Sequence, residues 1–419
     1  MRKIHFTIEP TIAGFTDQLV QFNAFYKLGL SLGFHYIHTP LSSERSNAPY
    51  LLVGAAPREI PVGSRIGALL KKAFARARPA APDIFDFLGI NRYFESSGRS
   101  NRPDPGNLRP RAISLSDTYL LERNIDSFES LAAHVDDLAR QYANDPEAIA
   151  AGATLISFRL DGPRRNCFSL IQARFPRFQD GLNLPAIYSE ARAREPIGSL
   201  YRRRSLKILL HIRQGDTGVI ETPWKTFLPV WSLRKDQLKE YGSFDQIESA
   251  ELLFEVAQYK AFLDEFLKRL DQSRRSILVF SDGANRGLRI VDRNLGKLGW
   301  SAEKVESFRN SRADYDRRQF SCFSADADVR LVVGEDPVKL RQLINSAIES
   351  DIVIVSNQLR MLPKLVANFC DERSPKVIVL YKKNRPVNSD IVSNDADRFI
   401  YVDIENPDYD SLIPRINAG

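Results

Sequence analysis

Residues 206–218 carry the side chains best suited to chemistry. The apolar run LKILLHI is followed by Arg213 and then by the polar turn QGDTG. A short apolar run ending in a glycine-containing turn is typical of a buried parallel strand, which delivers the next side chains to the carboxyl edge of its sheet. His211 and Arg213 alternate with the apolar residues, so we expect both on the face opposite Leu210 and Ile212. A guanidinium at a strand exit presents a planar fork of donors that suits a phosphate.

Two later apolar runs end in polar turns of the same kind. One leads into Ser281 and Asp282, and the other leads into Ser356, Asn357 and Gln358. If the three strands are neighbours in one parallel sheet, their turns open on the same edge. Together they predict a pocket for a nucleoside diphosphate.

Each turn has an expected part in this pocket. Arg213 would neutralise the phosphates, and Ser356 and Gln358 would donate to them together with backbone amides at the start of the following helix. Ser281 and Asp282 could hold the base or the ribose. Helix capping or turn formation is the alternative use of Asp282, because such residues are common in turns.

The turn after Arg213 adds Gly215 to the predicted donor site and supplies Asp216, for which capping or turn formation is again the alternative.

A second loop, residues 9–17, follows an expected first strand at Lys3–Ile8 and precedes an amphipathic helix over 18–32. In a strand, loop, helix, strand unit this loop lies at the carboxyl edge of the sheet. Asp17 there either caps the helix or meets a substrate.

Strand and helix patterns alternate along the chain and restart with the strand at 206. We therefore expect an α/β protein with two parallel-sheet domains, residues 1–200 and 201–419. The second is expected to have further strands near 276–281, 331–333, 351–356, 377–381 and 399–403, with helices at 250–270, 287–296, 337–350 and 361–369.

Composition limits the function classes. The 419 residues include 59 Lys plus Arg against 52 Asp plus Glu, a net charge of +7. That excess suits an anionic ligand but is spread thinly, and it is not interleaved with aromatic residues as in a nucleic-acid binder. Three widely separated cysteines favour a reducing compartment. No apolar run approaches the roughly 18 residues of a membrane helix, so we expect a cytoplasmic protein, with peripheral membrane association left open.

Three windows resemble the fucosyltransferase superfamily that includes the α1,2-, α1,6- and protein O-fucosyltransferases and the rhizobial chito-oligosaccharide fucosyltransferases. HIRQGD resembles their HxRxxD-type motif, TIAGFTDQLVQFNAFYKLGLSLGF their N-terminal loop and helix, and AIESDIVIVSNQLRMLPKLVAN their late motif. The windows occur in the family's order and cover under a quarter of the chain. The chain departs from the family at Ala13, where many relatives have a fuller glycine pair, and at Gln214, where many have a second arginine.

The resemblance implies a GT-B architecture, in which two Rossmann-like domains face each other across a cleft and the second holds most of the donor. It also implies inverting transfer of fucose from GDP-fucose to a glycan hydroxyl, without a metal or another cofactor. Arg213 would then hold the β-phosphate, His211 would shape the guanosine diphosphate site, and Ser356 and Gln358 would hold the phosphates.

The charge that develops on the departing diphosphate requires guanidinium and backbone donors. An acceptor hydroxyl also needs a general base, for which Asp17 is the first candidate and Asp216 the second. Two alternatives stay open: a GT-B transferase that uses another nucleotide sugar in surface polysaccharide assembly, and a non-catalytic nucleotide-binding protein of the same fold.

Overall fold

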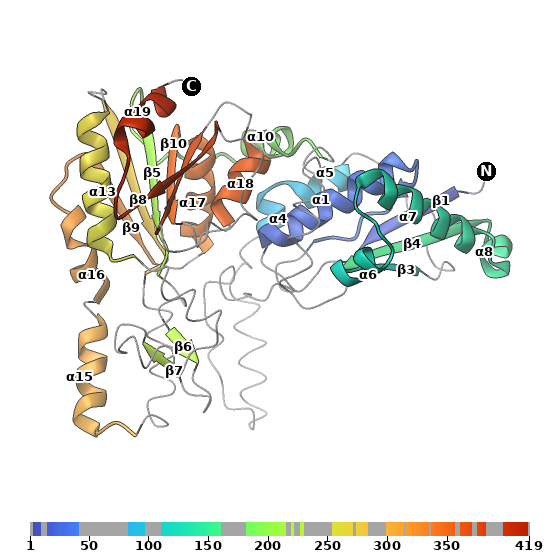
Figure 1. Cartoon of the computed structure of the whole chain (residues 1–419), viewed down its shortest axis with the longest axis horizontal. Helices are drawn as coiled ribbons and strands as arrows, with labels where there is room; N and C mark the ends of the chain where they lie inside the picture. Colours follow the sequence, from blue (N-terminus) through green and yellow to red (C-terminus); the bar gives the residue numbers. More distant parts are fainter. Residues whose placement is uncertain are drawn as a thin grey trace. The chain divides into compact units, whose positions relative to one another are not determined.

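A computed structural model gives the fold of the chain, which divides into two compact units, Met1–Pro196 and Ile197–Gly419 (Figure 1). The structure describes residues 3–9, 15–41, 83–96, 110–160, 182–214, 219–221, 227–229, 254–270, 274–283, 299–313, 315–334, 337–356, 361–370, 375–382 and 397–417.

The first unit is built on a parallel four-stranded sheet in the order β2-β1-β4-β3. The strands are β1 (Lys3–Ile8), β2 (His35–Tyr36), β3 (Arg111–Leu115) and β4 (Ala153–Leu160). The described helices are α1 (Phe15–Ser31), α4 (Ile84–Phe87), α5 (Ile90–Ser96), α6 (Asp117–Glu122), α7 (Phe128–Ala143), α8 (Pro146–Ala151) and α10 (Leu184–Arg194).

An aromatic cluster joins α1 to this sheet. Phe22 and Tyr26 lie one helical turn apart on α1, and both are in ring contact with Tyr36 of β2. Gly29, one turn further on, lies against the ring of Phe6, so a Cβ at this position would be 2.6 Å from the ring carbon Cε1. The helix therefore needs a residue without a side chain where it crosses β1.

The second unit contains a parallel six-stranded sheet in the order β12-β11-β10-β5-β8-β9. Its strands are β5 (Leu206–Ile212), β8 (Arg275–Ser281), β9 (Val329–Val333), β10 (Ile352–Ser356), β11 (Lys376–Tyr381) and β12 (Phe399–Asp403). When these strands are numbered 1 to 6 in sequence order from β5, their order in the sheet is 6-5-4-1-2-3. Read from the other edge, this is the order 3-2-1-4-5-6 of dinucleotide-binding Rossmann sheets. A separate antiparallel pair, β6 (Val219–Glu221) and β7 (Phe227–Pro229), follows β5 in the sequence.

Helices cover both faces of the six-stranded sheet (Figure 1). On one face, α13 (Val256–Arg269) and α19 (Tyr409–Asn417) share a core with alternate residues of β5, β8, β10, β11 and β12. On the other lie α17 (Pro337–Glu349) and α18 (Met361–Phe369). The remaining described helices are α15 (Ala302–Ala313), α16 (Tyr315–Phe320) and the 3-10 turn η6 (Ser321–Phe323).

The expected class of two parallel-sheet α/β domains is confirmed. Differences concern weak signals: the strand expected after the first helix is only His35–Tyr36, and β3 was not expected from the sequence. The helix expected over 287–296 lies outside the described residues. The helix expected over 250–270 begins later, at Val256, after its N-cap Glu255, and residues 250–253 lie outside the described residues. The helix expected over 18–32 begins earlier, at Phe15.

Candidate functional site

The ends of β5, β8 and β10 meet at one edge of the second sheet. β5 lies between the other two strands; His211 is paired with Val355 of β10, and Ile212 with Ser281 of β8. Because all three strands are parallel, their carboxyl ends lie at the same edge of the sheet. The neighbours β5 and β10 are also the first and fourth strands of the Rossmann order, so this is the topological switch point where such sheets bind ligands.

His211 is held at this switch point as a neutral imidazole. Its side chain lies on the sheet face opposite Leu210 and Ile212, as expected from the alternation, and the residue is only 4% exposed. Burial lowers the pKa of His211 from 6.5 to about 3, and the charge of nearby Arg213 acts in the same direction. Within the described part of the chain, its Nδ1 atom is buried without a hydrogen-bond partner. His211 can therefore donate or accept one hydrogen bond here but does not carry a proton at neutral pH.

Arg213 follows β5 directly and is half-buried. Its effect on the pKa of His211 puts the two groups within electrostatic reach of each other. A partly desolvated guanidinium beside a neutral imidazole is a local positive centre, and such a centre attracts a phosphate more strongly than a fully hydrated cation does.

Ser356 ends β10 with its side chain buried on the opposite face from His211. It shares the α13 side with Ile352 and Ile354, and it hydrogen-bonds with Tyr259 of that helix. Burial raises the pKa of the Tyr259 hydroxyl, and the negative charge of Asp282 raises it further. The structure therefore brings the ends of β5 and β10 together while directing the side chains of His211 and Ser356 to different faces.

Ser281 and Asp282 both make bonds that shape the turns at the edge of the sheet. The Ser281 hydroxyl accepts a hydrogen bond from the backbone N–H of Gly283 at 3.0 Å. One carboxylate oxygen of Asp282 accepts from the backbone N–H of Gln214 at 2.7 Å, which ties the exit of β5 to the exit of β8. The turn-forming alternative for Asp282 is thus realised for this oxygen.

Sequence reasoning missed α16 as part of this edge. The side-chain amide of Gln214 donates a hydrogen bond to the side-chain oxygen of Gln319 on α16 at 3.0 Å. Asp316 of the same helix lies so close to Gly283 that a Cβ there would be 2.7 Å from the carboxylate, and Gly283 itself has φ +69°. Polar residues three apart on a short helix are too common to have indicated this contact from the sequence.

Four of the predicted site residues lie outside the described part of the chain: Gly215, Asp216, Asn357 and Gln358. Asp17 falls in the first turn of α1, and its side chain lies outside the described part of the chain. α1 begins at Phe15, so Asp17 is inside the helix rather than before it.

The first sheet has a polar carboxyl edge of its own. The Ser157 hydroxyl of β4 donates to the carboxylate of Glu9, just past β1, at 2.7 Å. The hydroxyls of Thr7 and Thr39 are 2.6 Å apart. These groups offer hydrogen bonds suited to a neutral hydroxyl-bearing ligand rather than to an anion.

In the part of the chain that the structure describes, no group of three or more His, Cys, Asp and Glu side chains is arranged to hold a metal ion. None of the described helices is long and apolar enough to cross a membrane.

Comparisons with known proteins do not identify a family for the chain. No protein-family model matches the sequence, and no curated protein matches it. Among solved structures, the α,α-trehalose-phosphate synthase (UDP-forming) from Burkholderia vietnamiensis is similar with a TM-score of 0.27 and 10% identity, over 99% of this chain and 91% of that one. A likeness at this level defines neither the fold nor the activity of the chain.

Proposed function

We propose that the chain is a GT-B type glycosyltransferase that binds a nucleoside diphosphate sugar at the carboxyl edge of its second sheet. The observation that carries the proposal is the place of Arg213: it leaves the first strand of a Rossmann-ordered sheet, beside the fourth strand and next to a buried neutral histidine. This is where such sheets bind the phosphates of nucleotides. The sequence windows that resemble fucosyltransferases favour GDP-fucose as the donor.

The proposed chemistry is inverting transfer to a glycan hydroxyl without a metal. As the bond between the anomeric carbon and the diphosphate oxygen breaks, negative charge grows on the leaving group, and the guanidinium of Arg213 stabilises it. His211 is neutral, so it contributes a hydrogen bond rather than a second charge. Asn357 and Gln358, with the main chain at Ser356, are proposed to complete the phosphate site, while the Ser356 hydroxyl bonds to Tyr259 instead. Gly215, Ser281 and Asp282 would border the site.

The acceptor hydroxyl loses its proton as it attacks the opposite face of the sugar. Asp17 is our first candidate for the base and Asp216 the second. A folded-state pKa near 3 makes His211 a poor base at neutral pH. In this proposal residues 1–200 hold the acceptor, and residues 201–419 hold the donor.

Turnover measurements test the proposal. The protein is incubated separately with GDP-fucose, GDP-mannose and UDP-sugars, together with a panel of glycan acceptors, and the released diphosphate is quantified. We expect release with GDP-fucose that depends on the acceptor and is lost in Arg213→Ala. Transfer from another donor would retain the glycosyltransferase and reject fucose. Nucleotide binding with no transfer from any donor would indicate a non-catalytic protein of the same fold.

A further inference from the structure

One face of the first sheet is polar towards the carboxyl ends of its strands. Phe6 and Ile8 of β1 are buried, and Phe6 lies against Gly29 of α1. Because side chains alternate along a strand, His5 and Thr7 lie on the face away from α1. Parallel sheets are usually apolar on both faces. Polar side chains on one face, close to the edge where such sheets bind ligands, are a departure that a ligand site explains.

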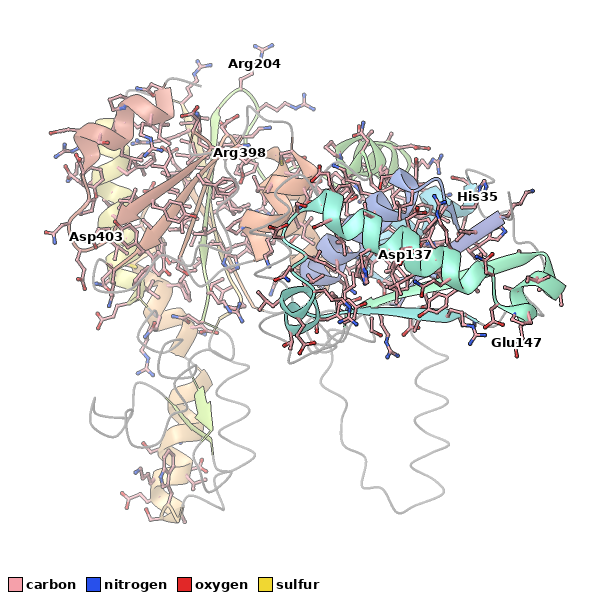
Figure 2. All side chains as sticks on the ribbon, turned by 45° about the vertical axis from the view of Figure 1, so that its right-hand side comes forward. His35, Asp137, Glu147, Arg204, Arg398 and Asp403 are labelled. Carbon is pink, nitrogen blue, oxygen red and sulfur yellow. The ribbon has the colours of Figure 1, made fainter. Side chains whose placement is uncertain are left out.

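Polar side chains from three neighbouring strands lie side by side on this face. Thr7 is opposite Ser157 of β4 in the register, and its hydroxyl is 2.6 Å from that of Thr39, which follows β2. Two residues earlier along β1, the ring of His5 is 5.7 Å from that of His35, which is labelled in Figure 2. Hydroxyl groups both donate and accept hydrogen bonds, so this part of the face suits a ligand that carries hydroxyls.

Glu9 places a carboxylate beside these hydroxyls. Its backbone N–H donates to the carbonyl of Phe158 at 2.9 Å, which extends the ladder between β1 and β4 by one residue. Its carboxylate oxygen Oε1 accepts a hydrogen bond from the Ser157 hydroxyl at 2.7 Å. Ser157 is only 2% exposed, whereas Glu9 is exposed. The main chain and the side chain of Glu9 are therefore both held by a buried strand while the carboxylate reaches solvent.

The carboxylate of Glu9 can accept further hydrogen bonds. An ionised carboxylate has about four acceptor positions, and among the described residues Ser157 is the only side chain that donates to Glu9. Oxygen Oε2 can therefore accept from a hydroxyl of a ligand. A general base must lie within hydrogen-bonding reach of the proton that it accepts, and a group fixed to a strand is positioned more precisely than one on a loop.

A purely structural role for Glu9 is the alternative. The buried hydroxyl of Ser157 needs an acceptor, and Glu9 supplies one. That need explains the hydrogen bond but not the negative charge, because a neutral oxygen satisfies a hydroxyl as well. The hydroxyls of Thr7 and Thr39, on the same face, satisfy each other without a charged group.

We propose that Glu9 is the general base of the transfer reaction and that Ser157 positions it. This inference rests on the proposed function, in which the first unit holds the acceptor. It places Glu9 ahead of Asp17 and Asp216, which were chosen from the sequence alone.

The proposed step moves one proton and exchanges one bond. The acceptor oxygen forms a bond to the anomeric carbon of the donor sugar, and its proton passes to Oε2 of Glu9. The bond between the anomeric carbon and the diphosphate oxygen breaks, and its electron pair leaves with the diphosphate. Glu9 then releases the proton to water, which restores the carboxylate.

The test measures kcat of the full-length protein and of Glu9→Gln. The donors are GDP-fucose, GDP-mannose and UDP-glucose, the acceptors are lactose, maltotriose and chitotetraose, and the released diphosphate is quantified. Glutamine keeps an oxygen that accepts from Ser157 but cannot take up the proton. We therefore expect kcat to fall about 100-fold or more, with an unchanged dissociation constant for GDP and an unchanged midpoint of urea unfolding.

Ser157→Ala tests the positioning role separately. This variant keeps the carboxylate but removes the hydrogen bond that orients it, so kcat should fall about tenfold, less than in Glu9→Gln. The dissociation constant for GDP should stay unchanged. A kcat equal to that of wild type would show that the bond to Ser157 does not position the base.

The matched control is Glu147→Gln, which makes the same change elsewhere in the first unit. Glu147, labelled in Figure 2, is exposed on α8 before the amino end of β4 and pairs with Arg111, so this variant should turn over as wild type does. Wild-type turnover in Glu9→Gln, equal losses in Glu9→Gln and Glu147→Gln, or a loss confined to Asp17→Asn would overturn the assignment of Glu9 alone. Failure of the wild type to transfer from every donor would reject the proposed function and the base with it.

Discussion

Arg213 and His211 show how two neighbouring polar residues acquire different charge states from their positions. His211 lies inside β5 and loses its proton to burial, whereas Arg213 lies just beyond the strand and keeps its charge because a guanidinium does not deprotonate in proteins. The pair therefore offers one cation and one neutral hydrogen-bonding group at the same edge. That combination suits a diphosphate, whose charge needs neutralising and whose oxygens need directed donors.

Removing the guanidinium should weaken nucleotide binding without unfolding the protein. In Arg213→Ala we expect the dissociation constant for GDP to rise about 10- to 100-fold, since hydrogen bonds to charged groups contribute about 1.5–3 kcal/mol. Isothermal titration calorimetry measures the change. Arg203→Ala is the control, because Arg203 is exposed and precedes β5 at the opposite end of the strand. Equal losses in the two variants would show that general charge, and not position, governs binding.

His211 should make the folded protein sensitive to acid. Its folded-state pKa of about 3 lies below the unfolded value of 6.5, so between these values the unfolded chain binds a proton that the folded chain does not. Stability is fully present above pH 6.5 and is lost as the pH falls towards 3. From pH 7 to pH 5 the contribution of His211 is about 2 kcal/mol.

Urea unfolding of wild type and His211→Gln at the two pH values measures this difference. The free energy of unfolding of wild type should fall by about 2 kcal/mol more than that of the variant. Because each protein is compared with itself at a second pH, any general destabilisation by the substitution cancels. An identical fall in both proteins would contradict a neutral buried histidine.

At the scale of single residues, the sequence predicted the face of His211 because a strand has a fixed period of two. The same logic applied to β10 places Ser356 on the α13 side, but the sequence did not reveal that Tyr259 lies there to bind it. Such a contact depends on how a helix packs, and packing joins residues that are nearly a hundred positions apart. The contact between Gln214 and Gln319 was hidden for the same reason.

At the scale of elements, Gly29 illustrates how packing overrides helix propensity. Alanine is favoured over glycine in a helix interior by about 1 kcal/mol, yet α1 has glycine where it crosses Phe6 of β1. The ring of Phe6 is fully buried, with 0% exposure, and has little room to move. Overpacking of a core costs about 1–3 kcal/mol, so the steric term wins.

Gly29→Ala should therefore lower the stability of the first unit by up to about 2 kcal/mol, the overpacking cost less the gain in helix propensity. Chemical denaturation followed by tyrosine fluorescence measures it, because all three tryptophans, Trp224, Trp231 and Trp300, belong to the second unit. Gly198→Ala provides the comparison, because a Cβ there would meet nothing within 4 Å. A Gly29→Ala protein that is as stable as wild type would mean that the helix and strand can separate at little cost.

Element boundaries followed the strength of the sequence signals. The buried strands of the second sheet are continuous apolar runs, so β5, β10 and β12 were predicted to within a residue or two. β3 was missed because its alternating pattern, RAISL, is short and follows a segment rich in proline and arginine. The strand order could not be predicted from periodicity, which identifies strands but not their neighbours.

At the scale of the whole molecule, two units with separate cores should unfold as separate steps. Differential scanning calorimetry of the full chain should then show two transitions. GDP that binds only the folded second unit stabilises that unit by mass action, by about 2.7 kcal/mol when its concentration is 100 times its dissociation constant. The melting temperature of one transition should therefore rise while the other stays unchanged. Equal shifts of both transitions would contradict a site confined to the second unit.

The most direct test of the central claim is a crystal structure of the chain with GDP. The account predicts that the β-phosphate lies at the carboxyl ends of β5 and β10, within hydrogen-bonding distance of the Arg213 guanidinium. GDP bound elsewhere on the molecule, or bound at this edge with Arg213 turned away from the phosphates, would contradict it.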